Sequence, residues 1–203
     1  HQYIIFLIPP TGIRYILIII LPIFSLSLYA EVKNYMFDIR YLGYSEGLSN
    51  ERVFSIVQDE NDAVWIATKI GIDRYNGTSV KSYELQGSQN YGDMAGRRVY
   101  VLYDKRFGIW AYDNVGRIFN YSKEKDTFEP IENLGQSIRD VILNNVHIDD
   151  KGALWLGLNK GLYKRSKKGE ITPVVKDIYV NDIISDGNAI YVGSSTAIIK
   201  VEG

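Results

Sequence analysis

The chain has 203 residues, of which 46% are hydrophobic and 23% charged, as is usual for a globular protein with a sizeable core. The formal net charge is −1 and the longest basic block is KRSKK at 164–168, so a nucleic-acid partner is not indicated. Cysteine is absent, which excludes disulfides, thiolate metal sites and cysteine nucleophiles. The 16 tyrosines and 18 glycines favour many short strands and turns.

Residues 1–30 form a hydrophobic segment that predicts a signal peptide or a membrane anchor. Arg14 is the one charged residue of this segment, and it precedes an apolar run from Tyr15 to Phe24. A basic residue, a short apolar run and a small residue before a polar chain are typical of a secretory signal, here cleaved after Ala30. The run is shorter than a membrane span of roughly 20 residues and contains Pro22, which favours the signal peptide over the anchor. Either alternative predicts that the rest of the chain is exported.

An internal repeat organises residues 31–203. Trp65, Trp110 and Trp155 are spaced 45 residues apart, and a shorter fourth copy has Tyr191 in the tryptophan position. Each tryptophan follows an aspartate by six residues and precedes a glycine by six: the aspartates are Asp59, Asp104 and Asp149, and the glycines are Gly71, Gly116 and Gly161. A period in the forties is typical of a modular repeat.

Each repeat divides into about four short segments rich in strand-forming residues. In the first repeat these segments are VFSIVQD, AVWIAT, IDRYN and SVKSYEL, separated by polar or glycine-containing turns. Four antiparallel strands in a repeat of this length are typical of a β-propeller blade, and no sustained helical periodicity occurs after residue 30. The sequence therefore predicts an all-β fold, a partial β-propeller of roughly four blades at about 48–85, 97–132, 138–176 and 180–203.

The blade count predicts a fragment of a larger ring. At 45 residues per blade, the residues after Ala30 supply fewer than four blades, and the fourth copy ends near its third strand. Residues 36–43 are expected to form a strand that closes the ring in the complete propeller. Without its last blade, the chain is expected to form an open arc with an exposed strand edge.

The repeated residues are interpreted as scaffold. The aspartates occupy equivalent turn positions, so we expect them to cap turns through side-chain hydrogen bonds to the backbone. The tryptophans are expected to fill the space between neighbouring blades, and the glycines to allow a tight backbone at the start of each third strand.

The stretch GLSNERVFSIVQDENDAVWIATKIGIDRYNG, residues 47–77, resembles the two-component regulator propeller repeat. The positions that match the family pattern are Gly47, Leu48, Ser49, Asn50, Val53, Ile56, Gln58, Asp59, Trp65, Thr68, Gly71 and Tyr75. Ala63 and Ala67 replace two glycines of the family pattern. The third repeat has both of these glycines, as Gly152 and Gly157. The second repeat is only moderately similar.

The resemblance implies the periplasmic sensor region of a hybrid sensor histidine kinase of the Bacteroidetes type. Many such proteins respond to polysaccharide breakdown products, with propellers outside the inner membrane and a kinase inside. The implied partners are an oligosaccharide ligand, downstream sensor and kinase domains of the same polypeptide, and a second copy in a homodimer. The implied location is the periplasm, with a tether to the inner membrane in the full-length protein.

Ligand-binding residues are expected in two sets of loops beside the central channel of the propeller. One set leads into the innermost strands and contains Asn50, Arg52, Arg97, Arg98, Arg139, Asp140, Asn181 and Asp182. The other joins the second and third strands and contains Lys69, Asp113, Asn114, Asn159 and Lys160. We take the residues at these polar positions to differ between blades. Because the repeated scaffold does not require such differences, these residues are candidates for ligand binding. The alternative is that they only form a solvated loop surface. Tyr91, in the long loop 86–98, is a candidate for stacking, and the arginines for bidentate binding of carboxylate or sulfate.

No catalytic constellation, metal site or cofactor motif is found, so an enzyme is not expected. His147 is the only histidine after residue 30, and Ser-His-Asp and histidine–metal arrangements need more partners. Two alternatives to a sensor module stay open: a stand-alone exported binding or adhesion propeller, and a propeller lyase or glycosidase.

Overall fold

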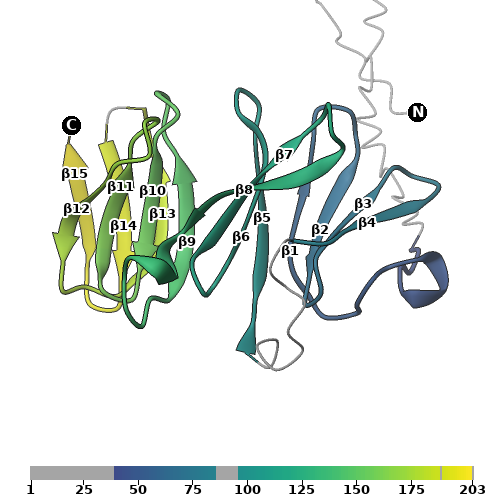
Figure 1. Ribbon diagram of the computed structural model, residues 1–203, viewed down its shortest axis with the longest axis horizontal. Coiled ribbons are helices and arrows are strands. Elements are labelled where there is room, and N and C mark those ends of the chain that lie inside the picture. Colours follow the sequence, from purple (N-terminus) through teal and green to yellow (C-terminus); the bar gives the residue numbers. More distant parts are fainter. Residues whose placement is uncertain (1–38, 86–95, 188, 203) are drawn as a thin grey trace, which may run out of the picture. The chain divides into compact units, whose positions relative to one another are not determined.

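Antiparallel strands make up most of the described part of this computed structural model, which comprises residues 39–85, 96–187 and 189–202 (Figure 1). Blade 1 has the strand order β1 (Val53–Gln58), β2 (Val64–Thr68), β3 (Ile72–Tyr75) and β4 (Val80–Tyr83). Blade 2 contains β5 (Val99–Asp104), β6 (Gly108–Asp113), β7 (Arg117–Ser122) and β8 (Thr127–Asn133).

Blades 3 and 4 repeat the same order of antiparallel neighbours. Blade 3 contains β9 (Leu143–Ile148), β10 (Leu154–Leu158), β11 (Gly161–Arg165) and β12 (Ile171–Lys176). Blade 4 has three strands among the described residues, β13 (Val180–Ser185), β14 (Ala189–Ser194) and β15 (Ile198–Glu202). Two short 3₁₀ helices, η1 (Tyr44–Glu46) and η3 (Leu134–Gln136), lie in connections. The predicted all-β propeller of repeated blades is confirmed.

The first strands of neighbouring blades lie side by side, β1 beside β5 and β9 beside β13. Ser55 of β1 accepts a hydrogen bond through its Oγ from the backbone N–H of Val101 at 2.8 Å. Asn144 of β9 donates from Nδ2 to the Val180 carbonyl, also at 2.8 Å. Side chains thus satisfy backbone groups of the neighbouring blade, which positions the loops that lead into these strands.

Three buried hydrophobic clusters join consecutive blades. The first places Trp65 and Ile72 of blade 1 against Phe119 and Phe128 of blade 2. The third places Trp155 of blade 3 against blade 4, and Trp110 packs at the edge of the cluster between blades 2 and 3. Trp65 and Trp155 are 1% and 7% exposed. The prediction that the tryptophans fill the space between blades is confirmed, because a large flat side chain buries much apolar area there.

The glycine that starts each third strand has a neighbour too close for a side chain. A Cβ on Gly161, where φ is +146°, would lie 2.2 Å from the Val175 carbonyl oxygen. A Cβ on Gly71 would lie 2.4 Å from the carbonyl oxygen of Tyr83. The tight backbone predicted for these glycines is therefore present, and it lets the third and fourth strands approach closely.

The strand expected at 36–43 is not present in its described part. Residues 39–43 are not in a strand, and Ile39 and Tyr41 are 74% and 88% exposed. A strand needs a neighbour to pair with its backbone groups, and no described strand pairs with this segment. Residues 36–38 and the hydrophobic segment 1–30 lie outside the described residues. No helix of the described part is long and apolar enough to span a bilayer.

Candidate functional site

Two sets of loops meet on one face of the blades, which we call the loop face. The backbone N–H of Lys69 donates to the Arg52 carbonyl at 3.0 Å, and that of Asn114 donates to the Arg98 carbonyl at 3.0 Å. The N–H of Asn159 does the same to the Ile142 carbonyl at 3.0 Å. In blades 1, 2 and 3, the loop before the first strand is thus tied to the loop between the second and third strands.

Asn114 and Asn159 tie these loops together in the same way. The Asn114 side chain accepts a hydrogen bond from the Arg98 backbone N–H at 2.9 Å and donates to the Gly96 carbonyl at 3.1 Å. The Asn159 side chain accepts from the Ile142 N–H and donates to the Asp140 carbonyl, both at 3.0 Å. This pair departs from the expectation that the loop positions differ between blades, because both amides brace the backbone of a neighbouring loop.

Arg97 and Asp113 form a buried ion pair beneath the loop face. They are 3% and 0% exposed, and Arg97 Nε lies 3.1 Å from Asp113 Oδ2. The same carboxylate oxygen lies 2.7 Å from Nε of Arg117. Burial lowers the pKa of Arg97, and the Asp113 carboxylate opposes that effect. Exposed ligand-binding side chains were expected here, but mutual charge neutralisation holds both inside the blade.

The other predicted residues lie nearer the surface of the loop face. Asn50 is half-buried and accepts a hydrogen bond from the Arg52 N–H at 2.9 Å, while the exposed Arg52 guanidinium lies 5.6 Å from the Phe54 ring centroid. Lys69 is half-buried, and Arg139 and Asp140 are exposed. Lys160 is exposed and donates to the Arg139 carbonyl at 2.6 Å. Tyr91 lies outside the described residues.

Two adjoining cavities on the loop face share Tyr179 as a wall, and we call them together the Tyr179 groove. One, of about 220 Å³, is lined by Gly96, Arg98, Tyr100, Asn114, Ile142, Leu143, Asn144 and Tyr179. The other, of about 500 Å³, is lined by Asn159, Lys160, Tyr163, Lys176, Asp177, Ile178 and Tyr179. The groove therefore brings together four of the predicted residues, Arg98, Asn114, Asn159 and Lys160.

The groove combines an exposed aromatic ring with polar groups. Tyr179 is 43% exposed, and its hydroxyl donates to Oδ1 of Asn144 at 3.3 Å. Tyr100 stacks on Tyr112 with ring centroids 5.0 Å apart. Arg98 is exposed, and no described residue pairs with its guanidinium. An aromatic surface beside amide and guanidinium groups suits a ligand with both apolar faces and hydroxyl or carboxylate groups.

Sequence reasoning missed Tyr179, Tyr100 and Asn144. Tyr179 directly precedes the first strand of blade 4, as Arg98 does in blade 2 and Arg52 in blade 1. Extending the repeat register by one more blade would have identified this position. Tyr100 and Asn144 lie within first strands, where only tertiary structure shows which side chains reach the groove.

The opposite face carries the turns between first and second strands. Asp59 accepts hydrogen bonds from the backbone N–H groups of Asn61 and Ala63 and, at 2.8 Å, from the indole N–H of Trp65. Asp149 accepts the indole N–H of Trp155 at 3.1 Å. The turn-capping role predicted for the aspartates is confirmed, and the additional bond to the indole was not predicted.

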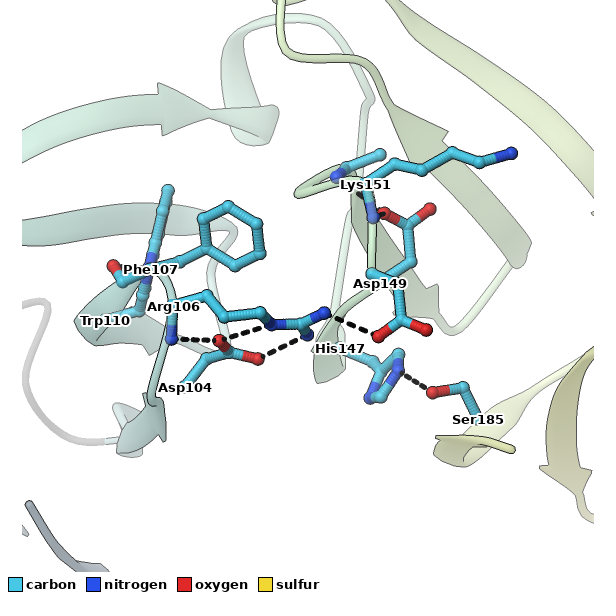
Figure 2. Close-up of polar contacts among 10 residues, drawn as sticks. Asp104, Arg106, Phe107, Trp110, His147, Asp149, Lys151 and Ser185 are labelled. Atoms are coloured by element: carbon cyan, nitrogen blue, oxygen red, sulfur yellow. Dashed lines mark hydrogen bonds and ion pairs between the residues drawn. The ribbon is translucent and has the colours of Figure 1, made fainter. Parts of the chain in front are cut away.

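Blade 2 departs from this pattern (Figure 2). Asp104 accepts from the backbone and side chain of Arg106, and the indole of Trp110 donates to the Phe107 carbonyl at 2.9 Å. Figure 2 shows Arg106 extending from this turn, and its Nη1 lies 2.6 Å from Oδ1 of Asp150 in blade 3. Blade 2 therefore differs from blades 1 and 3 in the acceptor of the indole N–H. In its turn, the Phe107 carbonyl lies within reach of the Trp110 indole and takes the place of the aspartate.

His147 links blade 3 to blade 4 on this face. Its Nε2 lies 2.9 Å from the Ser185 hydroxyl, as Figure 2 shows. Burial lowers the pKa of His147, against the opposing effect of several aspartates, of which Asp149 is the largest. The described residues contain no cluster of three or more histidine, aspartate or glutamate side chains suited to a metal ion.

Repeated antiparallel blades with scaffold residues at equivalent positions define the chain as a β-propeller protein. Residues 47–69 match the family model of the two component regulator propeller. Residues 47–69 are therefore similar to one repeat of this family, which agrees with the resemblance found in the sequence over this stretch. No curated protein sequence matches the chain.

Solved structures of low sequence identity share the fold. The extracellular domain of BT4673 from B. thetaiotaomicron, assigned as a one component system, has a TM-score of 0.62 at 18% identity, covering 79% of this chain and 23% of that chain. The extracellular domain of BT3049, assigned as a hybrid two component system of the same organism, has a TM-score of 0.62 at 18% identity, with 80% and 25% coverage. YCF48 from Cyanidioschyzon merolae has a TM-score of 0.53 at 13% identity, with 74% and 50% coverage. The chain thus spans about a quarter of the two bacterial domains.

Proposed function

We propose that this chain is part of the extracytoplasmic ligand-sensing region of a two-component signalling protein of the hybrid histidine kinase type. The match of residues 47–69 to the two component regulator propeller supports this function. The fold likeness to extracellular domains assigned to bacterial signalling systems supports it as well. The proposal includes export by residues 1–30, a periplasmic location with a tether to the inner membrane, downstream kinase domains in the same polypeptide, and a homodimer.

We further propose an oligosaccharide as the ligand and the Tyr179 groove as its site, and the composition of the groove carries this proposal. A sugar ring has an apolar face that packs on an aromatic ring and hydroxyl groups that hydrogen-bond at its edge. The 43% exposed Tyr179 ring supplies the first kind of contact, and Asn144 and Arg98 supply the second. Arg98 also suits a carboxylate or sulfate substituent, because the guanidinium binds such groups in a bidentate manner.

A glycan-panel measurement on this chain tests the site. We expect Tyr179→Ala and Arg98→Ala each to weaken binding of the best oligosaccharide by about tenfold, in line with the loss of one stacking or charge-assisted contact. Tyr41→Ala is the matched control, since Tyr41 is 88% exposed and lies outside the groove. Unchanged affinity in both groove variants would remove the groove from consideration.

The coding sequence beyond Gly203 tests the signalling role. A membrane span followed by a histidine-kinase motif supports sensing, whereas a stop codon soon after the ring closes favours a stand-alone binding or adhesion propeller. Turnover of a bound oligosaccharide would favour a propeller lyase or glycosidase instead.

A further inference from the structure

From the geometry of the face opposite the Tyr179 groove we infer a second binding site, for a small organic carboxylate of about the size of a sugar acid. A cavity of about 640 Å³ lies between blades 1 and 2 on that face, and we call it the blade 1–2 cleft. Its lining includes Trp65 and Arg74 of blade 1, and Tyr103, Lys105 and Tyr121 of blade 2. This volume suits a small molecule.

Three carboxylates line the blade 1–2 cleft, and two of them, Asp59 and Asp126, are occupied by neighbouring donors. The third, Glu60, lies 3.7 Å from the Lys123 ammonium. Asp59 accepts hydrogen bonds from two backbone N–H groups and the Trp65 indole. Asp126 accepts hydrogen bonds from Lys81, from the Tyr83 hydroxyl at 2.7 Å and from the Tyr121 hydroxyl at 2.6 Å. These hydrogen bonds hold the pKa of the Asp126 carboxyl far below its usual range, and the bond from Lys81 has the largest effect. The carboxylate therefore stays ionised and keeps accepting from these donors.

Donors in the cleft are left without acceptors. The buried hydroxyl of Tyr103 makes no hydrogen bond of ordinary geometry with a described residue, although Glu60 lies close to it. Burial, and then the nearby Glu60 carboxylate, raise the pKa of Tyr103, so the hydroxyl keeps its proton and is able to donate. Lys105 is exposed at the rim, and no described acid pairs with its ammonium. An unsatisfied donor beside a free cation calls for an anionic acceptor.

Arg74 adds a second cation at the floor of the cleft. Its guanidinium lies 5.4 Å from the Trp65 ring and 5.6 Å from the Tyr83 ring, and Nη1 donates to the Tyr121 hydroxyl at 3.0 Å. Nη1 also lies 3.7 Å from Oδ1 of Asp126, as an ion pair. The stacking fixes the guanidinium plane, and we assign its Nε and Nη2 groups to the ligand carboxylate.

The equivalent positions between the other blades are closed or neutralised. Between blades 2 and 3, Phe107 lies between the Arg106 guanidinium at 5.1 Å and the Lys167 ammonium at 5.6 Å. Between blades 3 and 4 the cavity is about 230 Å³, and Lys164 pairs with Asp149 at 3.3 Å. Among the described residues, the blade 1–2 cleft therefore combines the larger volume with uncommitted donors.

Titration of this chain with D-glucuronate, with D-glucose as the neutral control, tests the proposal. Binding is followed by NMR through the indole N–H resonances of the three tryptophans, because Trp65 lines the cleft. We expect saturable movement of the Trp65 resonance with glucuronate and none with glucose. No movement, or equal movement with both sugars, would overturn the carboxylate site.

Two conservative variants separate binding from folding. Tyr103→Phe removes an unpaired hydroxyl and Lys105→Gln removes an unpaired exposed charge, so both are expected to fold normally. Each should weaken glucuronate binding roughly fivefold, the effect of losing one hydrogen bond or charge contact. Lys151→Gln, at the blade 3–4 cavity, is the control and should leave the affinity unchanged. Unchanged affinity in both cleft variants contradicts the site, whatever Tyr179→Ala does to oligosaccharide binding on the loop face.

Discussion

The Asp59 carboxylate accepts the indole N–H of Trp65 at 2.8 Å, and this bond joins the turn of blade 1 to the blade interface. The indole donates to Oδ2, and the other oxygen, Oδ1, accepts from two backbone N–H groups of that turn. In blades 1 and 3, the aspartate six residues before the tryptophan and the tryptophan itself therefore form a single structural unit. It orients the ring that packs against Tyr121 and Phe128 of blade 2.

Asp59→Ala should lower the free energy of unfolding by about 2–4 kcal/mol, because it leaves a buried indole N–H and two turn N–H groups without their acceptor. Urea denaturation measured by tryptophan fluorescence checks this value. Glu60→Ala is the control, since Glu60 is exposed and its contact with Lys123, at 3.7 Å, is a surface ion pair. Equal midpoints for the two variants would contradict the structural unit.

Gly161→Ala should destabilise the protein by about 2–5 kcal/mol, through the overlap with the Val175 carbonyl and the positive φ. Gly193→Ala is the matched strand glycine, because a Cβ there would meet its nearest atom at 3.9 Å, an ordinary contact. Thermal unfolding of the two variants side by side gives the comparison. The idea fails if Gly161→Ala unfolds at the same temperature as Gly193→Ala.

Two of the ion pairs that blade 2 residues make, Arg97–Asp113 and Arg106–Asp150, should differ strongly in their effect on stability. Asp113→Ala leaves Arg97 buried without its counter-charge and should cost about 3–5 kcal/mol. Arg106→Gln removes the exposed contacts of the guanidinium with Asp104 and Asp150 and should cost less than about 1 kcal/mol. Chemical denaturation in low and high salt checks both values, and only the Arg106 contact should be sensitive to salt. A small effect of Asp113→Ala would show that Arg97 finds another acceptor.

His147 should make folding stability fall on mild acidification. Burial lowers its pKa in the folded protein, so as the pH drops through about 6.5 the unfolded chain takes up the proton first. The free energy of unfolding then decreases until the pH is below the folded-state pKa. His147→Gln should remove this part of the decrease between about pH 7.5 and about pH 5.5, as measured by urea midpoints. Parallel pH profiles for both proteins would assign the decrease to other groups.

The architecture followed from sequence because its determinants are local and repeated. The spacing of Trp65, Trp110 and Trp155 indicated the blades, and the alternating apolar segments indicated their strands. The turn aspartates and the third-strand glycines were also interpreted correctly, since caps and tight backbones depend on residues close in the chain. The ring-closing strand expected at 36–43 stays a prediction: residues 39–43 are not in a strand, and a strand depends on a pairing partner that local sequence does not supply.

The sequence by itself determined the blades and their scaffold residues, because both recur at a fixed period, and it indicated the family that residues 47–69 resemble. Only the tertiary structure decided which polar residues are available to a ligand. It buried Arg97 against Asp113, engaged Asn114 and Asn159 with loop backbone, and exposed Tyr179 at a groove. The physical reason is that a side chain's availability depends on which donors and acceptors from other strands reach it first, and packing between blades sets those distances.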